Sequence, residues 1–397
     1  MKILLVDENK VVNYTGGIEK VLCDFANEFT QRGHEVSLVC MDAEEGKPFF
    51  PLDERVRFIN LAAKTAYYGD FFDYRWLLKK IQREVSRLWD KKHDCKKSYF
   101  FRGFIQRLDV WLREIRPDVV ISIGPDSAIL AQKCPHIKDI PVISMCHIVP
   151  RIEHFSNEQI TAWQKCRMVQ VLQPVFVAQM QDLGITNLVT IPNCVKQTED
   201  ALVQNTRKTA DKKLVLIARI EPVRKRQHLA IQAFAQIAGK YPDWKLEMYG
   251  TVGNKKYYKQ LQQLIAEERL DNQVSINGPV KDLQQLYQHA AILLSASDYE
   301  SFGLSVVEAM SAGLPVIAFR DCYPDDYIVA DGKTGLLSDN SVEAFAKSMD
   351  ILMGDVALRE TYGQNAHEYA KKFAPEKIWA QWNDLLQECV KERTQGI

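Results

Sequence analysis

The chain has 397 residues, enough for two or three domains at roughly 100–200 residues per domain. Apolar residues make up 46% and charged residues 26%, as in soluble globular proteins, so the disordered and fibrous classes are excluded. Lys plus Arg and Asp plus Glu both number 51. The chain as a whole is therefore not built for nucleic acid or for an anionic surface, and any such preference must be local.

No segment predicts export or a membrane span. The first apolar stretch ends at Asp7 and Glu8, which leaves it too short for a secretion signal. No run approaches the about 20 apolar residues of a spanning helix. The nine cysteines are scattered and form no CxxC pair, which favours buried thiols in reducing surroundings over disulfides or a zinc site. We therefore expect a cytoplasmic protein.

The first half of the chain alternates between strand and helix patterns. Residues 2–7 are expected to form a short buried strand, a loop with Gly16-Gly17 follows, and apolar residues then recur at helical spacing from Ile18 to Phe29. A second apolar run at 35–40 completes a strand–helix–strand unit, which is the crossover unit of a parallel sheet. Further strands are expected at 118–123, 141–145 and 188–191.

Residues 196–211 are polar and aperiodic, so they are predicted to be a domain linker. The alternation then restarts. Strands are expected at 214–218, 245–249, 273–277, 291–295 and 315–319. Helices are expected at 227–238, 255–268, 282–290, 303–312 and from about 342 onward.

This pattern predicts two Rossmann-like α/β domains in tandem, each with a mainly parallel sheet. The expected domains are 1–200 and 201–374, with a C-terminal helix at 375–397 that packs back on the first domain. Open sheets of this kind bind ligands beyond the carboxyl ends of their strands. We therefore expect the two sheets to face each other across a cleft that holds the site.

The strongest local signal lies between Ser297 and Ala309, where an expected strand ends and a helix begins. Glu300 and Glu308 are eight residues apart, and Gly303 between them allows a ligand to approach backbone N–H groups at a helix N-terminus. Two carboxylates that flank an anion site suit a nucleotide sugar, which has hydroxyls at both ends and a diphosphate in the middle. On spacing alone, an ordinary helix start explains the pattern equally well.

Together with Gly313-Leu314-Pro315-Val316-Ile317, this segment resembles the signature of the retaining glycosyltransferases of family 4, which have the GT-B fold. Glu300 and Glu308 match the E-x7-E motif of that family. Four more segments match in the same order along the chain: Gly16-Gly17-Ile18-Glu19, Ala218-Arg219-Ile220 with the basic cluster after it, Tyr249-Gly250, and Asp331-Gly332-Lys333-Thr334-Gly335-Leu336-Leu337. The resemblance covers nearly the whole chain and is weakest from about residue 40 to 117.

The resemblance implies a role for each residue that matches the motifs. Glu308 would hold the ribose hydroxyls, and Glu300 would lie near the sugar. Backbone contacts to the sugar and phosphate are implied for Phe302, Gly303 and Leu304. Gly16 and Gly17 would approach the diphosphate, while Gly250 and Val280 would complete the nucleotide site. The backbone of 278–280 is suited to pair with the edge of a nucleotide base, but this pairing does not distinguish uracil from guanine or adenine. We expect UDP as the nucleotide.

The departing diphosphate gathers negative charge that a metal or fixed cations must neutralise. No Asp-x-Asp sequence stands in a strand-end loop, and the adjacent Asp325 and Asp326 would point apart. We therefore expect no metal and no other cofactor. Instead, Arg219 and a cation of the cluster Arg224-Lys225-Arg226 would grip the phosphates, as an Arg and a Lys do in the family. The family spacing selects Arg224, whereas the following helix aligns better with Lys225, which is preferred here.

His147 follows the expected strand 141–145, where relatives carry a His or Asp that faces the reacting sugar. An imidazole at this point would bond the sugar and orient the acceptor hydroxyl, although a core histidine explains the position too. Asp126 and Asn193 are weaker candidates that suit cap or turn roles as well. The resemblance implies front-face displacement, in which the leaving phosphate helps to deprotonate the acceptor, so that the protein mainly positions substrates and stabilises charge.

The sequence therefore predicts a retaining, metal-independent glycosyltransferase that moves a hexose from a nucleotide-diphosphate sugar to a hydroxyl of a glycan, a lipid-linked acceptor or a cell-envelope polymer. Two alternatives are another GT-B enzyme, such as a sugar-nucleotide epimerase or a phosphorylase, and a non-catalytic partner subunit. The E-x7-E motif together with Arg219 argues against both. Nothing indicates nucleic acid as a partner.

Residues 64–117 differ from the rest of the neutral chain. They hold fourteen basic and seven acidic residues, with aromatic residues interleaved. Such helices suit an anionic membrane surface, where each cation contributes about 1 kcal/mol. The same composition also describes aromatic core residues with a solvated basic face. The membrane reading predicts a peripheral enzyme on the inner face of the cell membrane.

Overall fold

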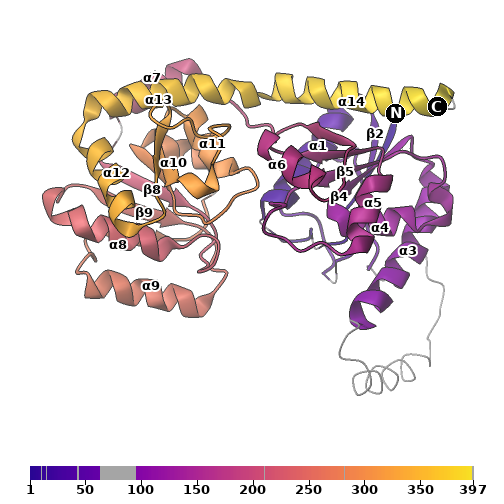
Figure 1. Cartoon of the computed structure of the whole chain (residues 1–397), viewed down its shortest axis with the longest axis horizontal. Coiled ribbons are helices and arrows are strands. Elements are labelled where there is room, and N and C mark those ends of the chain that lie inside the picture. The colour runs from indigo at the N-terminus through magenta and orange to yellow at the C-terminus, as the bar shows by residue number, and fades with distance from the viewer. Residues whose placement is uncertain are drawn as a thin grey trace. The chain divides into compact units, whose positions relative to one another are not determined.

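The computed structural model describes residues 1–9, 11–14, 16–42, 44–62, 95–209, 211–280 and 282–395. The chain divides into two compact units (Figure 1). The first comprises Met1–Val171, Phe176–Thr190 and Asn383–Ile397, and the second comprises Leu172–Val175 and Ile191–Trp382.

The first unit is built on a seven-stranded parallel sheet with the order β3-β2-β1-β4-β5-β6-β7. Its strands are β1 (Lys2–Val6), β2 (Glu35–Cys40), β3 (Arg57–Asn60), β4 (Val119–Ile123), β5 (Val142–Cys146), β6 (Met168–Val171) and β7 (Leu188–Thr190). Its helical elements are α1 (Gly17–Gln31), α3 (Cys95–Ile115), α4 (Gly124–Gln132), η1 (Pro135–Ile137), α5 (Asn157–Lys165) and α6 (Pro174–Gln181). The order reverses between β1 and β4, which defines the switch point of this sheet.

The first crossover shows why this segment folds as the sequence predicts. Val21, Phe25 and Phe29 lie on one face of α1 and are buried, because apolar residues at helical spacing form a single stripe. Gly33 has φ +84°, the left-handed conformation that commonly ends a helix. The chain then returns as β2, which pairs with β1 and contacts α1.

The second unit is built on a six-stranded parallel sheet with the order β10-β9-β8-β11-β12-β13. Its strands are β8 (Lys213–Ile217), β9 (Lys245–Tyr249), β10 (Val274–Asn277), β11 (Ile292–Ser295), β12 (Val316–Phe319) and β13 (Gly335–Ser338). Its helical elements are α7 (Asp200–Thr209), α8 (Gln227–Ile237), η2 (Ala238–Lys240), α9 (Lys255–Glu267), α10 (Leu283–Gln288), α11 (Leu304–Ser311), η3 (Arg320–Cys322), α12 (Val342–Gly354), α13 (Val356–Ala370) and η4 (Lys371–Phe373). The last helix, α14 (Pro375–Gln395), ends in the first unit.

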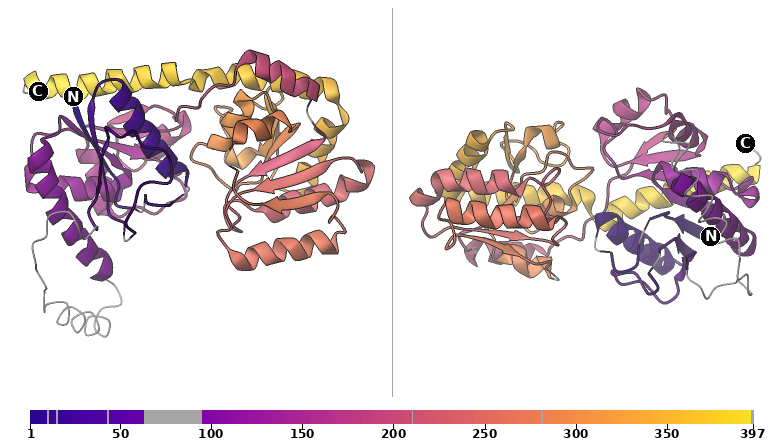
Figure 2. Two further views of the ribbon diagram at one scale, coloured as in Figure 1. Left: turned by 180° about the vertical axis from the view of Figure 1, so that it is seen from behind. Right: turned by 90° about the horizontal axis from the view of Figure 1, so that it is seen from below.

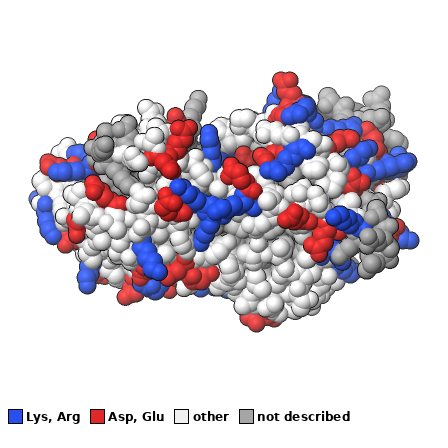
Figure 3. All heavy atoms as spheres, turned by 90° about the horizontal axis from the view of Figure 1, so that it is seen from above, with Lys and Arg blue, Asp and Glu red and all other residues white. Residues whose placement is uncertain are grey.

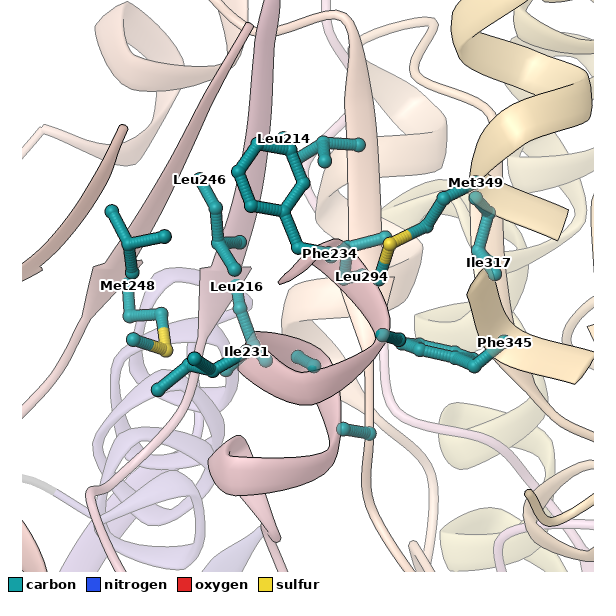
Figure 4. Close-up of a cluster of buried hydrophobic side chains, with 14 of the residues drawn as sticks. Leu214, Leu216, Ile231, Phe234, Leu246, Met248, Leu294, Ile317, Phe345 and Met349 are labelled. Carbon is teal, nitrogen blue, oxygen red and sulfur yellow. The ribbon is translucent and has the colours of Figure 1, made fainter. Parts of the chain in front are cut away.

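Helices pack against the second sheet (Figure 2). A continuous hydrophobic core joins one face of this sheet to helices α8, α9 and α12 (Figure 4). Leu214 and Leu216 of β8 alternate inward and pack with Phe234 of α8 and Phe345 of α12. All four side chains are at most 2% exposed. Their burial fixes β8 and the start of α8, and thereby the loop that connects them.

The predicted architecture of two α/β domains with parallel sheets is confirmed. The expected strands and helices occur within a few residues of their predicted bounds. Three short strands were not predicted: β3, β6 and β13. In β6 the apolar pattern is interrupted by Gln170, which the fold buries. Residues 63–94, the larger part of the predicted membrane-facing segment, lie outside the described residues.

The linker prediction for 196–211 is wrong, because residues 200–209 form helix α7 in the second unit. Its Val203 is 2% exposed, and its side chain packs against Gly313. Asp200 Oδ1 lies 2.8 Å from Nε2 of the buried His367. The sequence concealed this helix because a single buried apolar residue in a polar segment leaves no periodic pattern. The predicted boundary at residue 200 thus falls inside the second unit.

Acidic and basic side chains lie interspersed over the face that Figure 3 draws, in keeping with the overall neutrality of the chain. Among the helices in the described part of the chain, none is long and apolar enough to cross a membrane.

Candidate active site

The second sheet reverses its order between β8 and β11, and the loops that follow these two strands carry three of the four predicted catalytic residues. Arg219 and Lys225 lie in the loop after β8, and Glu300 lies in the loop after β11. The strands are direct neighbours, with Leu214 opposite Ile292. The carboxyl ends of strands at a switch point form the crevice in which open α/β sheets bind ligands.

Lys225 and Glu300 form an ion pair, with Lys225 Nζ on Glu300 Oε1. The two side chains are 20% and 13% exposed, and the Ser297 hydroxyl donates to the same carboxylate oxygen at 2.8 Å. Burial acts to raise the pKa of Glu300, but the charge and hydrogen bond of Lys225, with help from Ser297 and Arg224, outweigh it. The pKa of Glu300 therefore lies below its ordinary value, and the carboxylate is ionised at neutral pH.

The turn before α8 presents Arg224 and Lys225 differently. Glu221 Oε1 accepts both backbone N–H groups at 2.9 Å, which anchors the turn. Lys225 reaches Glu300, whereas the Arg224 guanidinium lies over the ring of Tyr299 at 4.8 Å. Of these two cations, Lys225 is therefore the one that contacts a glutamate of the E-x7-E motif.

Arg226 connects the two loops, a role that the sequence did not indicate. Its Nη2 donates to the Ser297 carbonyl at 3.1 Å and its Nε to the Ala296 carbonyl at 3.2 Å, while Nη1 lies 3.0 Å from Asp298 Oδ1. Its backbone has φ +43°, a left-handed conformation that costs a non-glycine residue about 1 kcal/mol or more. These contacts offset that strain and tie the loop after β8 to the loop after β11.

Arg219 is held by its backbone and by the stem of its side chain. A Cβ at Gly253 would lie 2.7 Å from Arg219 Cδ, so the stem rests against this glycine. Gly250 has φ +155°, and a Cβ there would lie 2.0 Å from the Ala218 carbonyl oxygen. Only glycine allows β9 to end so close to the residue before Arg219.

Helix α11 begins at Leu304, directly after Gly303, which has φ +83°. A Cβ at Gly303 would lie 2.4 Å from the buried hydroxyl of Tyr323, so both the backbone and the space require glycine. Phe302 is 1% exposed and packs edge-on against Phe373 at 5.2 Å. These contacts fix the helix N-terminus that the sequence predicted as an anion site.

Glu308 is half-buried in α11, four residues after Leu304. Burial, with a smaller contribution from the charge of Glu308, raises the pKa of Tyr287 well above its ordinary value. The Tyr287 hydroxyl donates to the Ser305 carbonyl at 3.1 Å, which holds the first turn of α11. Val280 follows β10 at the sheet edge and is half-buried.

Gly16 and Gly17 lie in the first unit, where Gly16 precedes α1 and Gly17 begins it. The switch point of this sheet also carries an acidic group that the sequence analysis missed. Ser127 Oγ donates to Glu8 Oε2 and accepts from the Glu8 backbone N–H at 3.1 Å, which joins the loop after β1 to helix α4. Burial raises the pKa of Asp7 to about 6 and, together with the charge of Asp7, that of Glu8 to about 7. The sequence signal for Asp7 and Glu8 was the position of these two carboxyl groups directly after the first strand.

His147 directly follows β5 in the first unit and is 8% exposed. Its Nε2 has no hydrogen-bond partner among the described residues. Burial lowers the pKa of His147 to about 4, so the ring is neutral at pH 7. Asp126 accepts a hydrogen bond from Gln159 at 3.0 Å, and Asn193 is buried in the second unit.

The buried neutral state of His147 predicts a loss of stability in acid. The unfolded chain takes up the proton near pH 6.5, whereas the folded chain takes it up only near pH 4. Stability therefore falls as the pH drops through this window, by about 2 kcal/mol between pH 7 and pH 5 from this one group. Urea unfolding of the wild type and His147→Gln at both pH values measures the difference. Equal losses in the two proteins would contradict the assignment.

A hollow of about 920 Å³ in the first unit lies away from these residues. It is lined by Pro141 and Val142 at the amino end of β5, by parts of α4 and α5, and by Cys389 of α14. None of the predicted site residues lines it, so it is not the predicted site.

Two α/β units, each with one parallel sheet, define the GT-B class of fold, and solved structures of that class match this chain over nearly its whole length. TarM of S. aureus, solved with fondaparinux, α-GlcNAc-glycerol and UDP, matches with a TM-score of 0.72 at 18% identity, over 97% of this chain and 99% of that one. HepE of Anabaena, solved with UDP and glucose, matches with a TM-score of 0.71 at 20% identity, over 98% and 99%. The predicted fold class is confirmed.

Two family profiles divide the sequence between them. Residues 15–199 match "Glycosyltransferase Family 4", and residues 197–369 match "Glycosyl transferases group 1". These matches support a GT-B glycosyltransferase.

The sequence is also similar to several bacterial proteins. An exopolysaccharide phosphotransferase of Streptomyces coelicolor is 28% identical over 95% of this chain, and a poly(glycerol-phosphate) alpha-glucosyltransferase of Bacillus subtilis is 26% identical over 46%. An uncharacterized glycosyltransferase of Haemophilus influenzae is 23% identical over 94% of this chain. The matches span 40% and 26% of the length of the first two relatives and 97% of the third.

Proposed function

We propose that this chain is a retaining glycosyltransferase that moves a hexose from a nucleotide-diphosphate sugar, with UDP as the nucleotide, to a hydroxyl of a glycan, lipid-linked or cell-envelope polymer acceptor. The observation that carries the proposal is the ion pair of Lys225 with the ionised Glu300 at the switch point of the second sheet, where Arg219 follows the neighbouring strand. The start of α11 follows Glu300 in the same loop.

The cations of this site have the chemistry that a leaving diphosphate needs. An ammonium group has three donors, so Lys225 is able to hold Glu300 and a phosphate oxygen at once. Arg219 offers a planar fork that binds two phosphate oxygens. Fixed cations at the place where charge develops lower the barrier without reorganisation. We therefore assign leaving-group stabilisation to Arg219 and Lys225 and require no metal.

The remaining roles follow the E-x7-E assignment. Glu308 holds the ribose, Glu300 lies near the sugar, and Phe302, Gly303 and Leu304 supply backbone contacts, with Gly250 and Val280 on the nucleotide. The leaving phosphate takes the acceptor proton in a front-face displacement, so the protein supplies position and charge. Gly16, Gly17 and His147 keep their predicted roles toward the diphosphate and the sugar.

Relatives support the choice of donor and acceptor. The structures of TarM and HepE contain UDP. Proteins similar to parts of this chain act, by their names, on poly(glycerol-phosphate) and on poly(ribitol-phosphate). Such acceptors fit a cytoplasmic enzyme at the inner face of the membrane. In this proposal the basic segment 64–117 binds the anionic membrane surface.

A panel of nucleotide sugars tests the proposal. The true donor at 100 times its Kd should stabilise the protein by about 2.7 kcal/mol in a thermal shift assay, in proportion to RT ln(1 + [L]/Kd). With poly(glycerol-phosphate) as acceptor, the products should be a nucleoside diphosphate and an α-glycosylated polymer. Release of a nucleoside monophosphate with a phosphosugar on the polymer would instead indicate phosphotransfer. An inverted linkage would overturn retention.

A further inference from the structure

Two buried glutamines contact the loops of the site, and the sequence singled out neither. Gln173 is 1% exposed, and its Nε2 donates to the Ser301 carbonyl at 2.8 Å. Gln227 is 0% exposed, and its Nε2 donates to the Arg219 carbonyl at 2.8 Å. A carbonyl only accepts hydrogen bonds, so both carboxamides must present their NH2 groups to these loops.

The two carbonyls belong to the backbone of the two site loops. Ser301 stands between Glu300 and Phe302 in the loop after β11. Gln173 lies in the short segment Leu172–Val175, which belongs to the second unit. Gln227 is the first residue of α8 and reaches back to Arg219 at the start of the loop after β8. Gln227 thus contacts the loop that carries Arg219 and Lys225, and Gln173 contacts the loop that carries Glu300.

Within the described structure, both carboxamides use only their NH2 group for hydrogen bonds. Gln173 Oε1 and Gln227 Oε1 are buried and have no hydrogen-bond partner among the described residues. A buried acceptor without a donor costs about 1–3 kcal/mol, whereas an apolar residue of similar shape avoids this cost. Buried polar atoms in folded proteins are nearly always hydrogen-bonded. The contact between Nε2 and each site loop explains why a glutamine, and not an apolar residue, stands at each position.

We propose that Gln173 and Gln227 are positioning residues that set the backbone of Ser301 and Arg219, and through it the places of Glu300 and of the Arg219 guanidinium. The inference rests on the proposed function and deepens it. Arg219 is a long and exposed side chain, so the place of its charge depends on how firmly its backbone and stem are held. A small misplacement of a charge-stabilising group reduces catalysis even where the fold is intact.

The test removes each amide and keeps its volume. Gln227→Met should weaken UDP binding and lower kcat/KM by about 10-fold, the scale of one lost hydrogen bond, because the diphosphate cation loses its backbone support. Gln173→Met should leave the Kd for UDP within about 2-fold and lower kcat instead, because Ser301 adjoins the sugar-side Glu300. Isothermal titration with UDP and steady-state kinetics with the donor separate these effects.

Gln197 supplies a matched control. Its Nε2 donates to the Val195 carbonyl at 2.6 Å, and its Oε1 lacks a hydrogen-bond partner in the described structure, but Val195 lies outside the two site loops. Gln197→Met should therefore leave kcat, KM and the Kd for UDP unchanged. A loss equal to that of the Gln173 and Gln227 variants would overturn the inference, because the defects would then reflect general destabilisation.

Gln173→Glu adds a readout that a purely structural role would not move. A carboxylate has no hydrogen to donate to the Ser301 carbonyl, whereas a protonated carboxyl group donates one. The activity of the variant relative to wild type should therefore rise as the pH falls from 8 to 6. A constant ratio would contradict the proposed hydrogen bond.

Hydrogen exchange of the ligand-free protein keeps this inference separate from the proposed function. Gln173→Met should speed exchange of amides in 297–303, and Gln227→Met should speed exchange in 218–226, relative to Gln197→Met. Unchanged exchange in both loops would overturn the positioning role. The variants could show faster exchange in these loops while the wild type neither binds UDP nor transfers sugar. That result would support the positioning role and overturn the proposed function.

Discussion

Replacing Arg219 by alanine should lower kcat by about 10²-fold or more, the scale of losing one preorganised group that stabilises transition-state charge. Gly253 and Gln227 hold the stem and the backbone of Arg219, and these contacts position its guanidinium for the proposed leaving group. Because the charge on the diphosphate grows as the glycosidic bond breaks, kcat should fall more than donor affinity. Steady-state kinetics with the identified donor measure both.

Arg219→Lys is the matched variant for this prediction. It keeps a positive charge but lacks the planar fork, so its activity should lie between that of wild type and Arg219→Ala. If alanine and lysine variants both kept wild-type kcat, Arg219 would have no part in leaving-group stabilisation.

The same site should work without a divalent metal, because fixed cations take the role that a metal would have. Excess EDTA should leave wild-type activity nearly intact. Loss of activity in EDTA that magnesium or manganese restores would refute the metal-independent mechanism, whatever the Arg219 variants show.

Breaking the Lys225–Glu300 pair should have the second large effect. Lys225→Met leaves the Glu300 carboxylate largely buried without its counter-ion, and breaking such a pair costs about 3 kcal/mol or more. Glu300→Gln removes the charge but keeps an acceptor for Ser297. The double variant should therefore be more stable than Lys225→Met alone. Urea unfolding of all four proteins gives the coupling energy of the cycle.

The stability that the pair contributes depends on pH in a defined direction. The pKa of Glu300 is lower in the folded chain than its ordinary value of 4.5, so the contribution is present above pH 4.5 and is lost as the pH falls further. Lys225→Met should lack this acid-dependent loss. Additive effects in the cycle, with the same acid profile in wild type and variant, would contradict the pair.

Glu308→Gln separates the catalytic effect of the pair from donor binding. Glu300→Gln should mainly reduce turnover because Glu300 is assigned to the sugar, whereas Glu308→Gln should mainly raise the Kd for the donor because the ribose is bound in both the ground and the transition state. Negligible effects of both changes would refute the assignment of the E-x7-E segment.

The sequence by itself predicted the fold class and the secondary-structure elements that carry the proposed site residues. Apolar runs such as 3–6 and the helical stripe of α1 predict buried strands and covering helices, because parallel strands are apolar on both faces and helices on one. The E-x7-E spacing with Gly303 placed a loop and a helix start at 297–309 without the structure. Each of these signals lies within a short stretch of sequence, so sequence analysis alone finds it.

Only the tertiary structure decided which of these groups meet and what holds them. Lys225 rather than Arg224 contacts Glu300, because Glu221 and Arg226 fix the turn that presents it. Gln173 reaches Ser301 across 128 positions of sequence. Helix α7 is held in place by Val203, which packs against Gly313, and by Asp200, which pairs with His367. Each of these depends on individual contacts, most of them between residues far apart in the chain, and such contacts leave no period, spacing or composition for sequence analysis to find.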